Sequence, residues 1–310
     1  MKSNQSNIKK AKKYLDKNYC ISVPTETVYG LAANAYVDLA VKKIFTLKKR
    51  PKNNPLIVHY LNIDSVKKDC LINDNFIKLY KKFSPGPLTY ILKLKQDSKI
   101  SKYVTNNAKS LAVRFPKHTL LKNLLKKLEY PLAAPSANIA TKVSAVKVSD
   151  VKEEFGNKIK YILDGGTCAI GIESTIVNLM NKPTILRLGG LDISKISKTL
   201  GMKVNIKLNS NKKISPGQSR LHYSPGIPLK MNVKKPKKEM AFILIKKRQN
   251  TLNNYFYLST NGNLIEVAKN LYSCLRKIKN QGYKTIGVEK IPNKGLGKAI
   301  NDRLYKASKF

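Results

Sequence analysis

The sequence contains no tryptophan, only four cysteines and three histidines, and only 18 acidic residues against 60 basic ones. The cysteines are scattered and form no C-x-x-C pair, so neither a zinc site nor a disulfide framework is predicted. No apolar run approaches the roughly 18 to 20 residues that a membrane-spanning helix needs. The first 20 residues also lack an apolar core of the signal-peptide type. These absences predict a cytoplasmic protein.

The shortage of acidic residues leaves a net charge of +42. Residues 231–310 carry +14 of it and the first 230 residues carry +28, so the charge is not concentrated in a basic tail. Such a field attracts nucleic acid and acidic ligands, whereas the abundance of lysine and asparagine is typical of compositional drift. Both explanations stay open. Because only seven of the basic residues are arginine, an arginine inside a special segment is the stronger indicator, as at Arg50, Arg114 and Arg187.

Short apolar, β-branched segments recur along the first two thirds of the chain and are predicted to be strands. They cover residues 20–23, 55–60, 88–94, 110–115, 161–166, 174–179 and 184–189. Amphipathic helical patterns lie between several of them, for instance at 38–49 and 75–82. This alternation predicts an α/β or α+β layered fold.

The pattern ends near residue 207, where two Ser-Pro-Gly triplets and a lack of periodicity predict a linker. It then restarts with predicted strands at 240–245, 255–259 and 285–291 and helices at 263–280 and after "NKGLG". We therefore predict a larger first domain over residues 1–206, which the resemblance described below identifies as catalytic, a linker over 207–229 and a small α/β domain over 230–310.

Several segments combine hydroxyl groups, cations and small residues. In "PTETVYG", Glu26 lies between two threonines, and the segment is either an ordinary turn or part of a site. In "LKKRPKNNPLIVH", Lys48 and Arg50 complement the dipole of a helix end or clamp a phosphate at a helix-to-strand corner. Arg114 ends a strand, which is where open α/β sheets bind ligands.

Further along, "PLAAPSAN", "GIESTIV" and "ILRLGG" add small residues, hydroxyls and Arg187, and free backbone amides in such segments can bind anions. The three histidines, His59, His118 and His222, lie in or beside these segments, and each taken alone is more typical of a structural histidine than of a catalytic one. The sequence has no Ser-His-Asp pattern, Walker A loop or metal-ligand cluster. The residues present suit phosphate and a small polar substrate, acted on by positioning and charge stabilisation.

Taken together, "PTETVYGL", "KKRPKNNPLIVH", "SPGPLT", "VRFPKH", "APSAN", "GIESTIV" and "ILRLGG" resemble the YrdC-type domain of threonylcarbamoyl-AMP synthases. The segments "HYSP" and "GLGKAINDRLYKAS" resemble the linker and C-terminal domain of the two-domain members. The resemblance implies a YrdC-like open twisted sheet around a basic cavity, followed by a small C-terminal α/β (Rossmann-like) domain.

The resemblance also implies a nucleotidyltransferase. It would make L-threonylcarbamoyl-AMP, pyrophosphate and water from L-threonine, bicarbonate or CO2, and ATP, as the first step of the N6-threonylcarbamoyladenosine modification of tRNA. ATP would be a substrate, Mg2+ would be carried by its phosphates rather than by a protein metal site, and a separate complex would pass the group to tRNA.

The family's functional residues carry over by motif position. Those that would contact L-threonine are Thr27, His59, Arg114, Ala134 and Ser174. Those that would contact ATP are Arg50, Asn54, Ser110, Ser136, Ser144, Arg187 and Tyr223. Lys48 and Arg50 would be the catalytic cations, offsetting charge on carbonate and phosphate, and the role of Glu26 stays open.

Three positions depart from the family pattern: Ser84 replaces a common tryptophan, Leu188 a common proline and Gln218 a frequent methionine. An alternative of another class is a non-catalytic RNA-binding module with a basic concave surface, although no RNA-reading motif is present. The carbamoyl-transfer use of YrdC-like domains in hydrogenase maturation is a second alternative. It expects zinc-finger cysteines and an acylphosphatase segment, which this sequence lacks.

Overall fold

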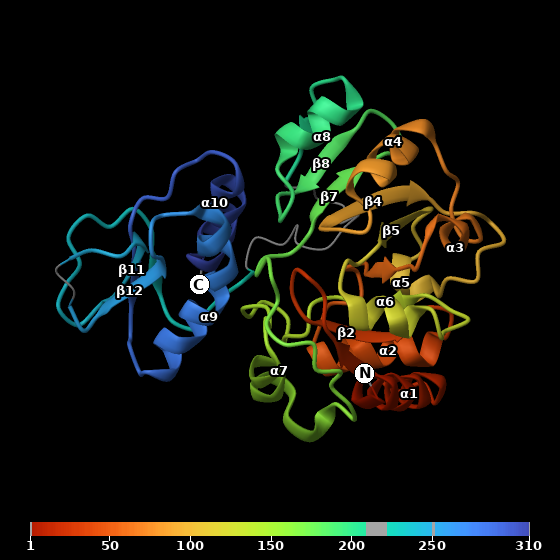
Figure 1. Ribbon diagram of the computed structural model, residues 1–310, viewed down its shortest axis with the longest axis horizontal. Helices are drawn as coiled ribbons and strands as arrows, with labels where there is room; N and C mark the ends of the chain where they lie inside the picture. Colours follow the sequence, from red (N-terminus) through yellow and green to blue (C-terminus); the bar gives the residue numbers. More distant parts are fainter. Residues whose placement is uncertain (1, 209–221, 250–251, 310) are drawn as a thin grey trace.

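The computed structural model describes residues 2–208, 222–249 and 252–309, which form two sheets flanked by helices (Figure 1). The larger sheet has the strand order β1-β2-β6-β3-β5-β4-β7-β8-β9, and the smaller has the order β10-β13-β11-β12. The prediction of an α/β fold with an open, curled sheet is confirmed. Residues 209–221 of the predicted linker lie outside the described residues.

The strands of the larger sheet are short and come from a long stretch of chain. They are β1 (Ile21–Val23), β2 (Gly30–Asn34), β3 (Ile57–His59), β4 (Leu88–Lys93), β5 (Ser110–Arg114), β6 (Leu132–Ala133), β7 (Thr175–Asn178), β8 (Thr184–Arg187) and β9 (Asn205–Ile206). Its helices are α1 (Lys2–Asp16), α2 (Asp38–Lys48), α3 (Ile63–Lys67), α4 (Asp74–Phe83), α5 (Lys102–Thr105), α6 (Thr119–Leu125), α7 (Val148–Phe155) and α8 (Ile193–Leu200), with a 3-10 turn at Gly156–Lys158.

Local sequence explains where several helices begin. The side chain of Asn73 accepts a hydrogen bond from the amide of Phe76 at the start of α4, and Asp192 does the same for Ser194 at the start of α8. Such side chains satisfy amides that the first helical turn leaves without partners. The helices predicted at 38–49 and 75–82 are confirmed as α2 and α4.

Four elements of the larger sheet's domain differ from the prediction. The sequence analysis missed α1, as well as β2 and β6, whose small residues have low strand propensity; both strands are buried and paired on two sides instead. The strand predicted at 161–166 is wrong. Only a single bridge, Ser22 to Ile162, forms there, and the chain turns at Gly166, whose φ is +74°.

The smaller sheet is entirely parallel. Its strands are β10 (Leu229–Lys230), β11 (Ala241–Lys246), β12 (Tyr255–Ser259) and β13 (Ile286–Val288), and its helices are α9 (Leu264–Asn280) and α10 (Leu296–Ala307). Helix α9 packs against both β12 and α10, and Figure 1 places α9 and α10 on the side that faces the larger sheet. The strands and helices predicted here are confirmed, with ends shifted by a few residues.

The two sheets share one continuous hydrophobic core. Polar contacts also join them: the Arg276 guanidinium of α9 donates to the carbonyl of Val143 at 2.6 Å and to Glu154 of α7 at 3.0 Å. A separate small cluster, built on Ile57, Ile91, Ala112, Ile176 and Leu186, occupies one face of the larger sheet. Across the described ranges, no helix has the length and apolar character to cross a membrane.

Candidate active site

One row of register partners crosses five neighbouring strands of the larger sheet. His59 of β3 pairs with Arg114 of β5, which pairs with Thr89 of β4. Thr89 pairs with Ile176 of β7, and Ile176 pairs with Arg187 of β8 beside a bulge. Register partners project to the same face of a sheet, and a bulge re-aims the side chain next to it. The row therefore brings a histidine and two arginines to one face, next to the small apolar cluster.

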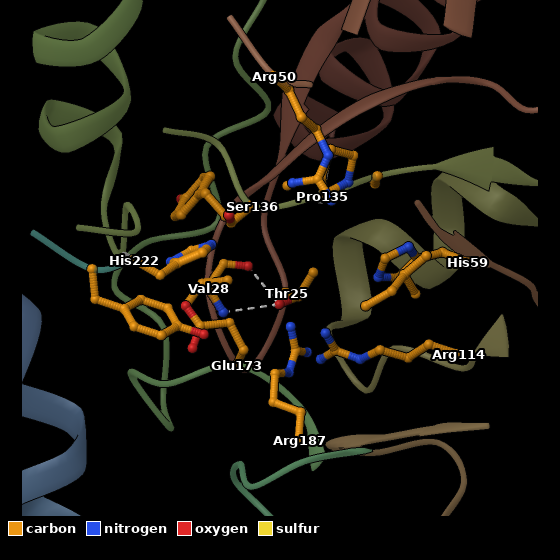
Figure 2. A pocket seen from close by; sticks show the side chains of 15 residues that line it. Thr25, Val28, Arg50, His59, Arg114, Pro135, Ser136, Glu173, Arg187 and His222 are labelled. Atoms are coloured by element: carbon orange, nitrogen blue, oxygen red, sulfur yellow. Dashed lines mark hydrogen bonds between the residues drawn. The ribbon is translucent and has the colours of Figure 1, made fainter. Parts of the chain in front are cut away.

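This face is the floor of a cavity with about 520 Å³ of empty space, part of it open to solvent (Figure 2). Among the residues predicted for the site, those that line it are Arg50, His59, Arg114, Ala134, Ser136, Arg187 and Tyr223. In Figure 2 the side chains of Arg50, Arg114 and Arg187 converge on this space from different elements. The structure therefore brings residues from both predicted sets, the one for L-threonine and the one for ATP, around a single cavity.

Glu26, whose role the sequence left open, holds Arg114 in place. One oxygen of its carboxylate accepts from Arg114 Nη2 at 2.7 Å, and the other accepts from the amide of Lys117 at 3.0 Å. Both side chains are buried, and a buried ion pair is sensitive to the loss of either partner. Glu26 thus fixes the direction of the guanidinium and balances its charge.

Arg50 and Arg187 differ from Arg114, because within the described residues neither has a carboxylate at ion-pair distance. Arg50 donates to the carbonyls of Asn54 and Pro55, and Arg187 donates to the carbonyl and the hydroxyl of Ser174 at 3.0 Å. Burial lowers the pKa of both guanidinium groups, and Arg187 lowers that of Arg50 further. Two buried, mutually repelling cations favour an anionic ligand between them.

Glu173 also lines the cavity, although the sequence analysis assigned it no role. Its carboxylate accepts from Ser144 Oγ at 2.6 Å, from Tyr272 of α9 at 3.0 Å and from Arg303 of α10 at 3.2 Å. Burial acts to raise the pKa of Glu173, but Arg303, Arg187 and Ser144 outweigh it and lower the pKa to about 2. The carboxylate is therefore charged at neutral pH and joins the cavity to the helices of the smaller sheet.

Thr27, Ser144 and Ser174 were predicted ligands but lie behind the cavity wall rather than in it. The Thr27 hydroxyl lies 2.8 Å from that of Thr25, which does line the cavity. Ser144 bonds Glu173, and Ser174 bonds Arg187. In this structure these three hydroxyl groups orient the residues that face the cavity.

Lys48, Asn54 and Ser110 also lie outside the wall. Lys48 Nζ, predicted to offset phosphate charge, donates instead to the carbonyls of Ser136 and Asn138, and burial lowers its pKa well below the ordinary value. Asn54 offers its carbonyl to Arg50. Ser110 begins β5, roughly 13 Å from Arg114 at 3.3 Å per strand residue. Their assigned contacts with ligands stay predictions.

Tyr223 closes one side of the cavity immediately after the undescribed residues 209–221. Its backbone adopts a left-handed φ of 63°, which a bulky residue rarely takes unless its surroundings fix it. The ring stacks on Tyr272 with centroids 5.9 Å apart, and the Arg303 guanidinium carbon lies 5.2 Å from its centroid. The helices of the smaller sheet thus support this wall.

Thr25, Glu173 and His222 line the cavity but were absent from the predicted contacts. Each stands one or two residues from a predicted contact in the same segment. The motifs therefore identified the segments that form the cavity wall, but not every side chain that faces the cavity. Within residues 2–208, 222–249 and 252–309, no group of three or more His, Cys, Asp and Glu side chains is placed to hold a metal ion.

Two buried histidines of the cavity make stability depend on pH. Burial, with Arg114 adding repulsion, lowers the pKa of His59 to about 3, and burial also lowers the pKa of His222 to about 3. Both stay neutral in the folded protein but take up protons on unfolding below pH 6.5. The free energy of unfolding is therefore highest above pH 6.5 as far as these histidines are concerned. It falls as the pH is lowered toward 3, by about 2 kcal/mol per histidine between pH 7 and 5.

Urea unfolding at pH 7, 6 and 5 measures this slope. His59→Gln is expected to remove about one proton from the uptake on unfolding, whatever its effect on absolute stability. A free energy of unfolding that is level from pH 7 to 5 would contradict a neutral, buried His59.

Comparisons with known proteins agree with this arrangement. A domain family described as "Telomere recombination" matches residues 13–189, and one described as "Threonylcarbamoyl-AMP synthase, C-terminal domain" matches residues 191–309. The threonylcarbamoyl-AMP synthase of Pyrococcus abyssi is 34% identical, over 96% of this chain and 92% of its own. That of Bacillus subtilis is also 34% identical, over 99% and 94%. The crystal structure of P. abyssi Sua5 complexed with L-threonine superposes with a TM-score of 0.89 at 34% identity, covering 97% of this chain and 94% of that one.

Proposed function

This chain belongs to the family of threonylcarbamoyl-AMP synthases, and we propose that its reaction takes place in the cavity bounded by Arg50, Arg114 and Arg187. The protein is a nucleotidyltransferase that makes L-threonylcarbamoyl-AMP. This function is favoured over the non-catalytic RNA-binding module. The observation that carries the placement is the convergence of three buried guanidinium groups, of which two have no carboxylate partner among the described residues.

L-threonine is proposed to bind at the β3–β5–β6 end, between His59, Arg114 and Ala134. Arg114 donates to Glu26 through Nη2, and its remaining N–H groups suit the substrate carboxylate. His59 lines the cavity and stays neutral when buried, so its imidazole can serve the substrate hydroxyl or amine. The solved relative that contains L-threonine supports L-threonine as the ligand. Thr27 and Ser174 are proposed to act through Thr25 and Arg187.

ATP is proposed to bind toward the opposite end, where Arg50 and Arg187 face the phosphates and Tyr223 and Ser136 border the nucleotide. The carbonyls of Asn54 and Pro55 hold the Arg50 guanidinium, and the carbonyl and hydroxyl of Ser174 hold Arg187, so both cations are fixed before the ligand arrives. Fixed charges stabilise a transition state without the cost of reorganising it. Lys48 is proposed to act on this end through the Ser136–Asn138 backbone that it holds.

In the proposed reaction the threonine amine takes up CO2 to form a carbamate. A carbamate oxygen then attacks the α-phosphorus of ATP in line, forming the P–O bond of the adenylate as the bond to pyrophosphate breaks. The three arginines offset the charge on carbamate and phosphates. Glu173 is unsuited to act as a base, because its pKa is about 2 and three side chains occupy its oxygens.

Other parts of the assignment are proposals that depend on the family. Mg2+ would enter with the nucleotide and neutralise phosphate charge. The downstream tRNA threonylcarbamoyl-transfer complex would take the product, in the cytoplasm. The division at residues 206 and 229 into a catalytic domain, linker and C-terminal domain is supported by the two separate sheets.

Incubation with ATP, L-threonine and labelled bicarbonate tests the function directly. We expect labelled threonylcarbamoyl-adenylate and pyrophosphate, neither of which forms when L-threonine is omitted. A folded protein that releases no threonine-dependent pyrophosphate but retains RNA in a salt-sensitive way would favour the RNA-binding module instead.

A further inference from the structure

Glu173 lies between two arginines that come from different parts of the chain. On one side, Nε and Nη2 of Arg303 both donate to its Oε2 at 3.2 Å. On the other side, Arg187 shares the cavity wall with Glu173 and lowers its pKa, yet it is not within ion-pair distance. The carboxylate is thus paired with the arginine outside the cavity wall and only near the one inside it.

The backbone around Glu173 places it within reach of Arg187. Ser174, the next residue, accepts from Arg187 through both its carbonyl and its hydroxyl. The amide of Gly190 donates to the Glu173 carbonyl at 2.9 Å, which ties the same two segments together. A carboxylate released from Arg303 would therefore have a buried cation beside it, and opposite charges attract strongly when both are buried.

Arg303 is well fixed for this task. It is fully buried in α10, its guanidinium also meets Asp302 at 3.2 Å, and Tyr272 supports the same carboxylate from α9. Arg303 does not line the cavity, so it has no direct access to a ligand there. Of the groups that it contacts, Glu173 and Tyr223 line the cavity, so these two can carry its effect to the reaction.

We propose that Arg303 is a positioning residue: by holding the Glu173 carboxylate, it prevents that carboxylate from pairing with Arg187 and keeps the Arg187 guanidinium available for the nucleotide phosphates. This inference rests on the proposed placement of ATP. In this proposal helices α9 and α10 do not line the cavity, but they keep the positive charge of Arg187 free to bind a ligand there.

The test compares Arg303→Gln, Glu173→Gln and the double variant by threonine-dependent pyrophosphate release at varied ATP and at varied L-threonine. Arg303→Gln is expected to raise the KM for ATP by about tenfold or more while the KM for L-threonine changes by less than about threefold. Adding Glu173→Gln removes the competing carboxylate and is expected to return the KM for ATP to within about threefold of the original value.

Arg276→Gln is the matched control, since it removes a buried arginine of α9 that joins the two sheets through Val143 and Glu154 but lies away from the cavity. It reports the effect of loosened packing and is expected to leave the KM for ATP within about threefold. If Arg303→Gln does not fold, the double variant is used, because it removes both charges and leaves neither of them unpaired. Its KM for ATP is then compared with that of the unaltered protein, and a value more than about threefold higher would overturn the inference.

Failure of Glu173→Gln to restore the KM for ATP would overturn the inference, and so would an equal rise in both KM values or the same pattern in Arg276→Gln. Arg303→Lys, which keeps the charge, is expected to retain a KM for ATP nearer the original. An unaltered protein without threonine-dependent turnover would overturn the proposed function itself, whereas normal turnover without rescue would overturn the role of Arg303 alone.

Discussion

Replacing Arg50 with alanine is expected to abolish threonine-dependent pyrophosphate release, with a loss of about a thousandfold or more in kcat/KM for ATP. Arg50 presents a buried charge that the carbonyls of Asn54 and Pro55 fix toward the cavity. Alanine removes both that charge and a rigid pair of donors. Water entering the space could not replace them, because a pre-oriented cation contributes most where the surroundings exclude water.

Pyrophosphate release in the presence of L-threonine and bicarbonate is the measurement for Arg50→Ala. Arg248→Ala is the control, since it removes the same charge from a side chain that is 52% exposed and that, in the described part of the chain, pairs with Glu289 at the surface. Thermal unfolding of both variants separates lost chemistry from lost structure. Turnover that persists unchanged in folded Arg50→Ala would exclude Arg50 from the reaction.

Replacing Glu26 with alanine is expected to lower kcat/KM for L-threonine by about a hundredfold. Without Glu26, the Arg114 guanidinium loses its 2.7 Å partner and the amide of Lys117 loses its acceptor. Leaving a buried arginine unpaired is also expected to lower the free energy of unfolding by about 3–5 kcal/mol. Glu26→Gln should lose less, because its amide oxygen can still accept from Arg114.

Initial rates at saturating ATP with varied L-threonine, and the reverse, test whether the effect of Glu26→Ala falls on the threonine side. Glu129→Gln removes an exposed carboxylate and serves as the control for net charge. An equal rise in the KM values for ATP and L-threonine would contradict the placement of Arg114 beside L-threonine.

The sequence predicted most of the strands, because β-branched runs such as those that become β4, β5 and β7 carry a clear signal. It did not predict β2, in which "GLAAN" has the composition of a loop and is a strand only because β1 and β6 pair with it on both sides. The reverse error occurred at 161–166, where an apolar local sequence makes only one bridge. In both cases tertiary pairing, which no local window contains, decided the structure.

The scarcity of arginine proved a better guide to the site than the net charge of +42. Arg50, Arg114 and Arg187 all reach the cavity, and Arg276 and Arg303 join the two sheets. The motifs could not reveal which hydroxyl of "PTET" faces inward, because Thr25 and Thr27 differ only in the turn geometry that their hydrogen bonds create. Nor could they reveal that Glu173 would be held by Tyr272 and Arg303, which lie 99 and 130 positions further along the chain.

The row of register partners from His59 to Arg187 also links the site to the folding of the sheet. Its members come from strands β3, β4, β5, β7 and β8, which spread over residues 57–187 and form one row only when the sheet is assembled. A slip of one residue in β8 would turn Arg187 to the opposite face. A nascent or misregistered chain therefore lacks part of the cavity's positive charge, so the proposed phosphate site is complete only when β8 is paired in this register.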